Sequence, residues 1–297
     1  MQKVLNFGSL NIDYVYTVEH FVCPGETLNS TCMERFAGGK GLNQSIALAR
    51  AGAQVVHAGK IGLEGIFLKE TLDRSGVDTS MIKQGQGSTG HAIIQVDKHG
   101  ENCILLFGGT NQQIDEIFVD EVLALFEKDD ILLLQNEINQ LPLIVRKAYD
   151  KGMRIALNPS PYDKNLSEVP LECIRWFIMN EIEGRELTGM NSADDIVDAM
   201  LIRYPQCCVM LTLGKKGAVY ADKQQRLYQD IFATTEVDTT AAGDTFTGYF
   251  LAGLLQNLPM KTILRRASYA SSLAVSRKGA SGSIPMLSEV EKVDSIQ

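Results

Sequence analysis

Short runs of apolar residues alternate with longer segments of helical periodicity over most of the chain. Such nearly continuous apolar runs are typical of strands buried on both faces, as in a parallel sheet covered by helices. The predicted strands of this region are I-L-L-L-Q (131–135), R-I-A-L-N (154–158), W-F-I-M-N (176–180) and C-C-V-M-L-T-L (207–213). The predicted helices are 115–127, 140–151, a short one before Trp176, 181–188, 192–203, and two near 242–256 and 260–275.

The first third of the chain mixes this pattern with another one. K-V-L-N-F and V-V-H-A-G-K-I predict strands, and residues 40–52 and 64–75 predict helices. Residues 14–36, in contrast, alternate loosely around the turn at Pro24-Gly25, and two apolar runs flank K-H-G-E at 98–101. Each of these two segments predicts a β-hairpin.

We therefore predict one α/β domain over residues 1–297, with three layers (α/β/α) and a mostly parallel, Rossmann-like central sheet. The hairpins, from about 12–36 and 88–108, are expected to form a separate small β-sheet that acts as a lid. The chain starts directly with a strand, so no targeting segment is expected before the fold.

The amino-acid composition limits the classes of partner that the protein can bind. Acidic side chains number 36 and basic ones 28, a net charge of -8, which argues against nucleic acid or an anionic membrane as the main partner. The 6 cysteines are scattered without a C-x-x-C motif, and the histidines form no metal-ligating pattern. No apolar stretch is long enough to span a bilayer. We expect a reduced, cytoplasmic protein.

The segment D-T-T-A-A-G-D-T (238–245) carries the strongest chemical signal. The spacing of Phe246, Tyr249 and Phe250 beyond it predicts an amphipathic helix, so Ala241–Gly243 should form its entry turn. The amides of such a turn are unpaired, and small side chains leave them open to an anion. Asp244 beside them can take a proton from a hydroxyl group. Alternatively, Asp244 and Thr245 merely cap the helix.

A second glycine-rich segment, A-G-G-K-G-L-N-Q, spans residues 37–44. It is not a Walker A phosphate loop, because Gly41 follows the lysine where that motif has Ser or Thr. One interpretation is a flexible junction between hairpin and helix. The other is a close backbone approach to a polyhydroxy ligand, with Lys40 and Asn43 donating hydrogen bonds.

Polar residues interrupt the chain where the predicted strands end. In a parallel sheet, ligands gather at the C-terminal ends of the strands. Asn11 and Asp13 are expected to end the first strand on alternate positions and so to face the same side, unless they only stabilise a turn. The other polar residues at strand ends are Glu137, Asn158, Asn180 and Thr212.

Two of these segments together resemble a known family. V-D-T-T-A-A-G-D-T-F resembles the C-terminal signature of the PfkB (ribokinase-like) carbohydrate kinases, and A-G-G-K-G-x-N-Q resembles their first signature in its ribokinase form. The resemblance extends from Gly8 to Pro285. It implies the ribokinase-like fold and ATP-dependent phosphorylation of the primary hydroxyl of a sugar. D-ribose, converted to D-ribose 5-phosphate, is the expected substrate.

The resemblance also implies roles for individual residues. Asp244 would be the catalytic base, beside the amides of Ala241, Ala242 and Gly243. The sugar would be held by Asn11, Asp13, Gly39, Lys40, Asn43 and Glu137. ATP with Mg²⁺ would be bound by Asn180, Glu183, Thr212, Gly214, Gly217, Gly243 and Ser268, the last at a position where ribokinases often have Asn beside the adenine. A potassium ion would be surrounded by Asp238, Thr240, Ala274, Arg277, Gly279 and Ser283, several of them through backbone carbonyls. A homodimer through the lid sheet is also implied.

Some segments depart from the family pattern. I-G-L-E-G-I-F (61–67) displaces the usual acid and glycine, and F-G-G-T-N-Q-Q-I (107–114) replaces the commoner G-A-N-x-x-L. Another kinase of the family, acting on 2-deoxyribose, another sugar or a nucleoside, therefore stays open, as does a non-catalytic sugar-binding protein. For T-L-G-K-K-G (212–217), a plain strand-turn-strand is the alternative to an ATP loop. A Rossmann dehydrogenase is disfavoured because no G-x-G-x-x-G follows the first strand.

Overall fold

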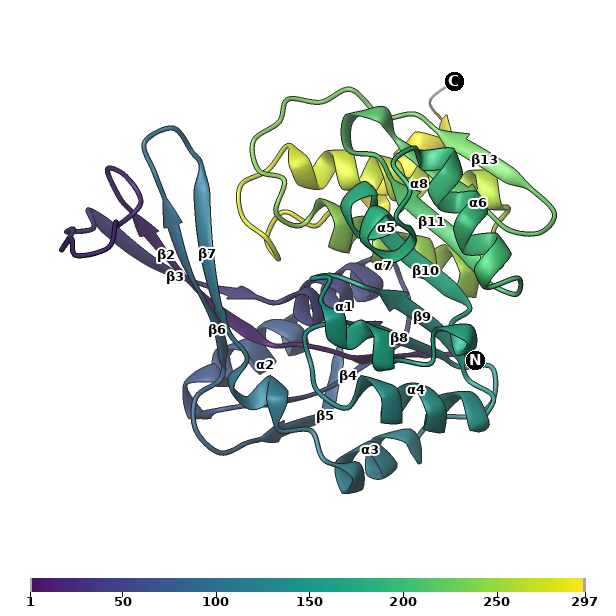
Figure 1. The fold of residues 1–297 in the computed structure, drawn as a ribbon, viewed down its shortest axis with the longest axis horizontal. Helices are drawn as coiled ribbons and strands as arrows, with labels where there is room; N and C mark the ends of the chain where they lie inside the picture. The colour runs from purple at the N-terminus through teal and green to yellow at the C-terminus, as the bar shows by residue number, and fades with distance from the viewer. Residues whose placement is uncertain (1, 296–297) are drawn as a thin grey trace.

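The computed structural model describes residues 2–295, and over these it contains one nine-stranded sheet and one four-stranded sheet (Figure 1). The strand order of the large sheet is β13-β12-β11-β10-β9-β8-β1-β4-β5. Neighbours from β5 to β11 run parallel, and β12 and β13 are antiparallel. The strands are β1 (Val4–Phe7), β4 (Val55–Ile61), β5 (Asp78–Gln84), β8 (Ile131–Gln135), β9 (Arg154–Asn158), β10 (Trp176–Asn180), β11 (Cys208–Thr212), β12 (Ala218–Ala221) and β13 (Arg226–Gln229).

Helices cover both faces of this sheet, which confirms the predicted three-layer fold. Alternate strand residues feed two separate cores: Leu133 belongs to one, and its neighbours Leu132 and Leu134 to the other. The first core includes residues of α1 (Lys40–Arg50), α2 (Ile66–Arg74), α7 (Ala242–Leu255) and α8 (Met260–Val275). The second includes residues of α3 (Glu116–Leu123), α4 (Leu141–Asp150) and α6 (Ala193–Arg203), with α5 (Glu181–Thr188) beside it. A last short helix, α9, spans Leu287–Val290.

The small sheet is a separate layer, as predicted, and projects from the body of the molecule (Figure 1). It consists of β2 (Asn11–Thr17), β3 (Cys32–Gly38), β6 (Gly90–Val96) and β7 (Asn102–Phe107) in the order β3-β2-β6-β7, and we call it the lid sheet. Both hairpins are antiparallel, and β2 and β6 join them in parallel. The edge strand β7 is exposed along its whole length, including its apolar residues 104–107.

The first strand ends earlier than the sequence predicted. β1 stops at Phe7, so Asn11 and Asp13 do not end it; they begin β2 of the lid sheet. The prediction was wrong because G-S-L-N-I-D continues the extended pattern of β1, although the chain leaves the large sheet at Gly8. The two side chains still occupy alternate positions of one strand and therefore share a face.

Helix α7 is not amphipathic, contrary to the prediction. Every residue from 244 to 253 is buried, because α7 packs against both α1 and α8 in the middle of its layer. Two strands, β5 and β13, were not predicted, because they are only half buried and show no long apolar run. The short helix expected before Trp176 consists of two 3₁₀ turns, Lys164–Glu168 and Leu171–Cys173.

No helix among residues 2–295 has both the length and the apolar character needed to cross a bilayer. All six cysteines are unpaired.

The contact between α1 and α7 depends on Gly248. A Cβ atom at this position would lie 2.3 Å from the Cβ atom of Ala47 and 2.7 Å from the Ala47 carbonyl carbon. Backbone atoms of α1 therefore lie where the side chain of any other residue would be. Gly243 on the same helix differs, because a Cβ atom there would meet nothing within 4 Å.

We expect Gly248→Ala to destabilise the protein by about 1–3 kcal/mol, because α1 must move to admit the methyl group. Thermal unfolding should show a melting temperature several degrees below that of the wild type. Gly243→Ala is the matched control and should melt at or above the wild-type temperature, since alanine favours the helix. Equal melting temperatures for the two variants would contradict this account of the helix contact.

Candidate active site

The N-termini of α1 and α7 meet at the edge of the large sheet where its parallel strands end. α1 begins after Gly39, whose φ of 92° is in the left-handed region, and α7 begins after Ala241. Neither helix has a side-chain N-cap. The alternative that Asp244 and Thr245 merely cap α7 is therefore wrong. The positive ends of two helix dipoles point into one region, which favours an anion there.

Asp244 is buried and is held by α1 rather than by its own helix. Its Oδ1 atom accepts a hydrogen bond from Gln44 Nε2 (2.9 Å), and its Oδ2 atom accepts one from Asn43 Nδ2 (3.1 Å). Burial raises the pKa of Asp244, while Lys40 and the two amides act against this rise. The Oδ1 atom of Asn43 is buried without a partner among the described residues.

Lys40 is the cation of the site. Burial alone would lower the pKa of Lys40, but the carboxylates of Asp244, Glu137 and Glu183 outweigh burial and raise it. The lysine therefore stays charged. The Lys40 ammonium group thus interacts electrostatically with three carboxylates: Asp244 on α7, Glu137 after β8 and Glu183 on α5.

The glycines of G-G-K-G allow a close approach of backbone segments, and the flexible-junction interpretation is not needed. A Cβ atom at Gly38 would lie 2.0 Å from Asp13 Oδ2, and one at Gly41 would lie 2.4 Å from the Ser9 nitrogen. Gly39 has the positive φ described above. The start of α1 is therefore pressed against the link between β1 and β2.

Glu137 is held at the start of α1 by hydrogen bonds. Its Oε2 atom accepts hydrogen bonds from the Ser9 hydroxyl and from the Lys40 amide (3.1 Å for the amide). Burial raises the pKa of Glu137, although Lys40 and Ser9 oppose this rise. The structure thus brings Glu137, Lys40 and Asn43 together with Asp244, as the sequence predicted.

Asp13 and Asn11 extend this group onto the lid sheet. Among the described residues, none donates a hydrogen bond to the Asp13 carboxylate. Burial, reinforced by Glu137, raises the pKa of Asp13 to about 7. Asn11 Oδ1 accepts a hydrogen bond from Asn111 Nδ2 (2.7 Å), and Asn111 also bonds the backbone of Leu10. Asp13 therefore keeps its acceptor oxygens free for a ligand.

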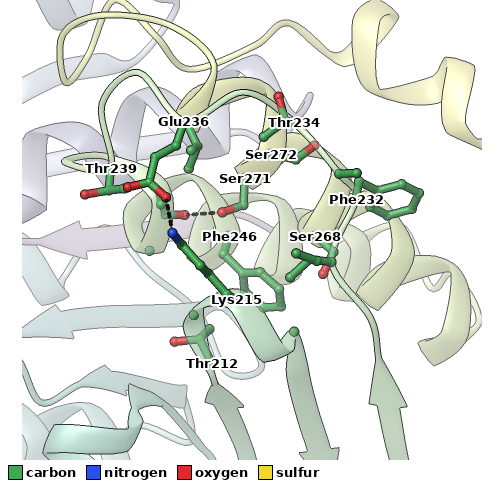
Figure 2. Close-up of a pocket in the computed structure, with 17 residues that line it drawn as sticks. Thr212, Lys215, Phe232, Thr234, Glu236, Thr239, Phe246, Ser268, Ser271 and Ser272 are labelled. Atoms are coloured by element: carbon green, nitrogen blue, oxygen red, sulfur yellow. Dashed lines mark hydrogen bonds and ion pairs between the residues drawn. The ribbon is translucent and has the colours of Figure 1, made fainter.

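Two cavities lie side by side beyond Asp244. The larger has a volume of about 610 Å³ and is lined by Thr212, Gly214, Gly217, Gly243 and Ser268 among others (Figure 2). The smaller, of about 180 Å³, is lined by Lys40, Asn158, Asn180, Glu183 and Asp244 among others. Thr212 and Gly243 line both cavities. The predicted nucleotide residues thus line two adjacent cavities, the smaller of which is also lined by Asp244.

The wall of the larger cavity combines apolar and hydroxyl groups (Figure 2). Lys215 and Glu236 form an ion pair (3.1 Å) beside it. Ser271 Oγ donates a hydrogen bond to the Ala242 carbonyl (3.0 Å), which ties α8 to the first turn of α7. T-L-G-K-K-G joins β11 to β12, which confirms the strand-turn-strand interpretation, and Thr212, Gly214 and Gly217 also line the cavity.

The first turn of α7 is open on the cavity side. A Cβ atom at Gly243 would meet nothing within 4 Å, so this surface faces empty space. The amide of Ala242 donates to the Thr239 carbonyl (3.1 Å), whereas those of Ala241 and Gly243 have no backbone acceptor among the described residues. An anion here would therefore find free amides, including those of Ala241 and Gly243.

Asn180 and Glu183 have a local structural role as well. Asn180 is the N-cap of α5, and Glu183 closes a capping box by accepting bonds from the Asn180 backbone and side-chain nitrogens. Both residues nevertheless line the smaller cavity, and their side chains carry oxygen atoms, the ligands that Mg²⁺ prefers.

The residues predicted to surround potassium lie in two segments that the structure joins. Asp238 Oδ2 accepts a hydrogen bond from the Gly279 amide (2.9 Å), and Asp238 Oδ1 accepts one from the Thr240 amide (2.9 Å). Arg277 forms an ion pair with Glu289 (2.6 Å). Ala274 O accepts from the Arg277 amide, and Ser283 Oγ donates to Ala280 O. Within residues 2–295, no cluster of three or more His, Cys, Asp or Glu can hold a metal, so a cation here would rely on carbonyl and hydroxyl oxygens.

Sequence reasoning missed Ser9, Gln44 and Asn111. Ser9 binds Glu137, Gln44 binds Asp244, and Asn111 binds Asn11. Gln44 lies inside the G-G-K-G-L-N-Q segment, so its position next to Asn43 was the available signal.

Comparison with known proteins gives a consistent result. Residues 1–287 match the pfkB family carbohydrate kinase model. A ribokinase of Haemophilus influenzae is 37% identical over 299 residues, which cover 97% of this chain and 97% of the relative. The structure of a Cryptococcus neoformans ribokinase with ADP aligns with a TM-score of 0.87, at 32% identity and over 98% and 99% of the two chains. An Arabidopsis thaliana ribokinase complexed with ribose and ATP aligns with a TM-score of 0.89, at 28% identity and over 100% of both chains.

The raised pKa of Asp13 predicts a pH-dependent stability. Because the folded protein holds the proton of Asp13 more tightly than the unfolded chain, ionised Asp13 costs stability above pH 7 and costs nothing below about pH 4. Asp13→Asn should therefore raise the free energy of unfolding at pH 8 by roughly 2–4 kcal/mol. The difference from the wild type should shrink as the pH falls through 7 towards 4.

Thermal unfolding at pH 8 and at pH 5 tests this expectation. Asp150→Asn, at an exposed position, is the control and should show no such pH-dependent difference. A stabilisation by Asp13→Asn that is equal at both pH values would show that burial of the charge is not its cause.

Proposed function

Because the chain belongs to the pfkB family of carbohydrate kinases, we propose that it transfers the γ-phosphoryl group of ATP to the 5-hydroxyl of D-ribose. The products would be D-ribose 5-phosphate and ADP. The observation that carries the proposal is the pairing of an open helix turn with a buried carboxylate. Gly243 faces empty space, and Asp244 next to it points into the junction of α1 and α7.

Phosphoryl transfer requires mainly positioning and charge stabilisation. The free amides of Ala241 and Gly243, at the positive end of α7, would hold oxygens of the transferring group. Asp244 lines the smaller cavity together with Gly243, and it would accept the proton of the sugar hydroxyl. Ala242 contributes its small side chain, which leaves the turn uncovered, while its amide holds the Thr239 carbonyl.

The sugar would lie between the lid sheet and α1. Asp13 has acceptor oxygens without a protein donor, and Asn43 has a buried Oδ1 atom without a partner. Hydroxyl groups of a sugar would satisfy both. The other proposed sugar-binding residues are Asn11, Gly39, Lys40 and Glu137. A wrong sugar would leave some of these polar groups buried and unpaired, which discriminates strongly between substrates.

ATP would occupy the larger cavity, with Thr212, Gly214, Gly217 and Ser268 along its wall and its phosphates directed to Gly243. Mg²⁺ would be held at the smaller cavity through Asn180 and Glu183, and when bound it supplies positive charge to the phosphates. Potassium would occupy the region of Asp238, Thr240, Ala274, Arg277, Gly279 and Ser283. There it would support the loop that leads into α7.

The lid sheet would close over the sugar and exclude water, which competes as a phosphoryl acceptor. Its edge strand β7 exposes Leu105 to 67% and Phe107 to 53%. Exposed edges and apolar faces of small sheets are normally covered, so we propose a homodimer through the lid sheet. Disulfides are rare in the cytoplasm, where thiols are kept reduced. Because all six cysteines are unpaired, we propose that the protein is cytoplasmic.

The motifs do not separate D-ribose from 2-deoxyribose. An assay of ADP release over ribose, 2-deoxyribose, fructose, adenosine and pseudouridine decides between the kinases of this family. Failure with every acceptor, together with tight ribose binding, would instead favour a non-catalytic sugar-binding protein. The retained Asp244 argues against that alternative, because sugar binding alone needs no base beside an open helix turn.

Asp244→Asn should lower kcat by about 10²–10⁴-fold, because asparagine cannot accept the proton of the hydroxyl. ATP affinity, measured by titration calorimetry, should stay near the wild-type value, since the larger cavity is untouched. Wild-type turnover in this variant would remove Asp244 from the role of base.

Potassium should activate the enzyme at constant ionic strength. Asp238→Ala should reduce this activation, because the Asp238 carboxylate joins the two segments around the proposed ion site. The measurement is the initial rate of ADP release in potassium and in sodium chloride. Equal rates in the two salts with the wild-type protein would eliminate the potassium site.

A further inference from the structure

Three buried amide side chains form a chain of hydrogen bonds behind Asp244. They belong to Asn6 on β1, Gln135 on β8 and Gln44 on α1, and each side chain is fully buried. Asn6 Nδ2 donates to the Gly41 carbonyl (2.7 Å), and Gln135 Nε2 donates to Asn6 Oδ1 (3.0 Å). Gln135 Nε2 also donates to Gln44 Oε1 (2.7 Å), and Gln44 Nε2 donates to Asp244 (2.9 Å).

The donor-to-acceptor direction of this series of hydrogen bonds is determined by the Gly41 carbonyl. A side-chain amide can turn over and exchange its donor and acceptor, but a backbone carbonyl can only accept. Asn6 must therefore present its nitrogen to Gly41 and its oxygen to Gln135. Gln135 must then present its nitrogen, which also faces the oxygen of Gln44. Gln44 is left with its nitrogen towards Asp244, which is the orientation that a carboxylate requires.

This arrangement leaves one atom unsatisfied. Gln135 Oε1 is buried and has no hydrogen-bond partner among the described residues. Burying an unpaired acceptor destabilises a fold, and an apolar side chain at this position would avoid that loss. The polar side chain at residue 135 therefore does something other than stabilise the core.

We propose that Gln44 is a positioning residue for Asp244, and that Gln135 fixes the Gln44 amide in the orientation that donates. The inference rests on the proposed function, in which Asp244 receives the proton of the substrate hydroxyl. A permanent donor on Oδ1 holds the carboxylate in one rotamer. It also favours the ionised carboxylate, which is the form able to accept a proton.

The other charged groups around Asp244 do not replace this donor. Lys40 on α1 faces it, but the same ammonium group also serves Glu137 after β8 and Glu183 on α5. Asn43 donates to the second oxygen, Oδ2. Without Gln44, the Oδ1 atom of this buried carboxylate would lose its side-chain donor. The protonated form would then be more stable, relative to the ionised form, than it is in the wild type.

The test compares Gln44→Met and Gln135→Met with the wild type by the pH profile of kcat. Methionine preserves the length of the side chain and removes its hydrogen bonds. For Gln44→Met we expect kcat at pH 7 to fall at least about tenfold, with the acidic limb moved to higher pH by about one unit. Gln135→Met should act in the same direction but less strongly, because it frees the Gln44 amide without removing it.

KM for ribose and for ATP should change by less than about threefold in both variants, since neither glutamine lines a cavity. Ser45→Ala is the matched control. Ser45 is equally buried and accepts the second bond from Asn6 Nδ2 (2.8 Å), but the Gly41 carbonyl still fixes the direction without it. This variant should keep the wild-type pH profile.

A Gln44→Met protein that folds and keeps the wild-type kcat and pH profile would overturn the inference, while an inactive Asp244→Asn protein measured beside it would leave the proposed function intact. Full activity in Asp244→Asn would overturn the proposed function itself. If Gln44→Met does not fold, Gln135→Met, which does not touch Asp244, decides the question by its acidic limb. The inference would also be overturned if Gln135→Met and Ser45→Ala lowered kcat equally and the acidic limb of the pH profile stayed in place. Such a result would indicate general loosening of the core.

Discussion

The site depends on the close packing of α7 against α1, which brings the N-termini of the two helices together. Gly248 makes this packing possible, because Ala47 and its backbone occupy the space of a side chain. The same packing places Asn43 and Gln44, on the first turns of α1, against Asp244 on the first turn of α7. A buried carboxylate is thereby given two amide donors and a nearby lysine before any ligand binds. Asp244 is thus held by the helix layer, while Asn11 and Asp13 lie on the lid sheet.

Much of this could be predicted from the sequence, because the strongest signals are local. The apolar runs of β8 to β11 require burial on both faces, and they fixed the fold class. The edge strands β5 and β13 were missed since an edge strand needs only one buried face and shows no long apolar run. The position of α7 between two helices was also missed, because the apolar residues of 246–254 fit a one-sided helix equally well. Burial on the second side is set by α1, some two hundred residues away in the chain.

The candidate site divides in the same way. Motif residues such as Lys40, Asn43 and Asp244 were predicted, and the structure brings them together. Ser9, Gln44 and Asn111 were not, because a single sequence does not show which group a side chain contacts, and only Gln44 had a local signal in its place beside Asn43. The hydrogen bond from Gln44 to Asp244 joins residues 200 positions apart. Such a partner becomes visible only when the topology is known, and the same holds for the amide chain that runs through Asn6 and Gln135.

The charges of the site lead to one more conclusion about its chemistry. Asp244, Glu137 and Glu183 share a single lysine, Lys40, and Asp13 adds a fourth carboxyl group whose pKa is raised to about 7. ATP in the larger cavity, as proposed above, would bring several further negative charges close to this group. The free amides of Ala241 and Gly243 supply only partial charge, since a helix N-terminus is equivalent to about half an elementary charge. Lys215 lies at the larger cavity, but it is paired with Glu236. A divalent cation at the smaller cavity, as proposed above, would add positive charge beside the phosphates.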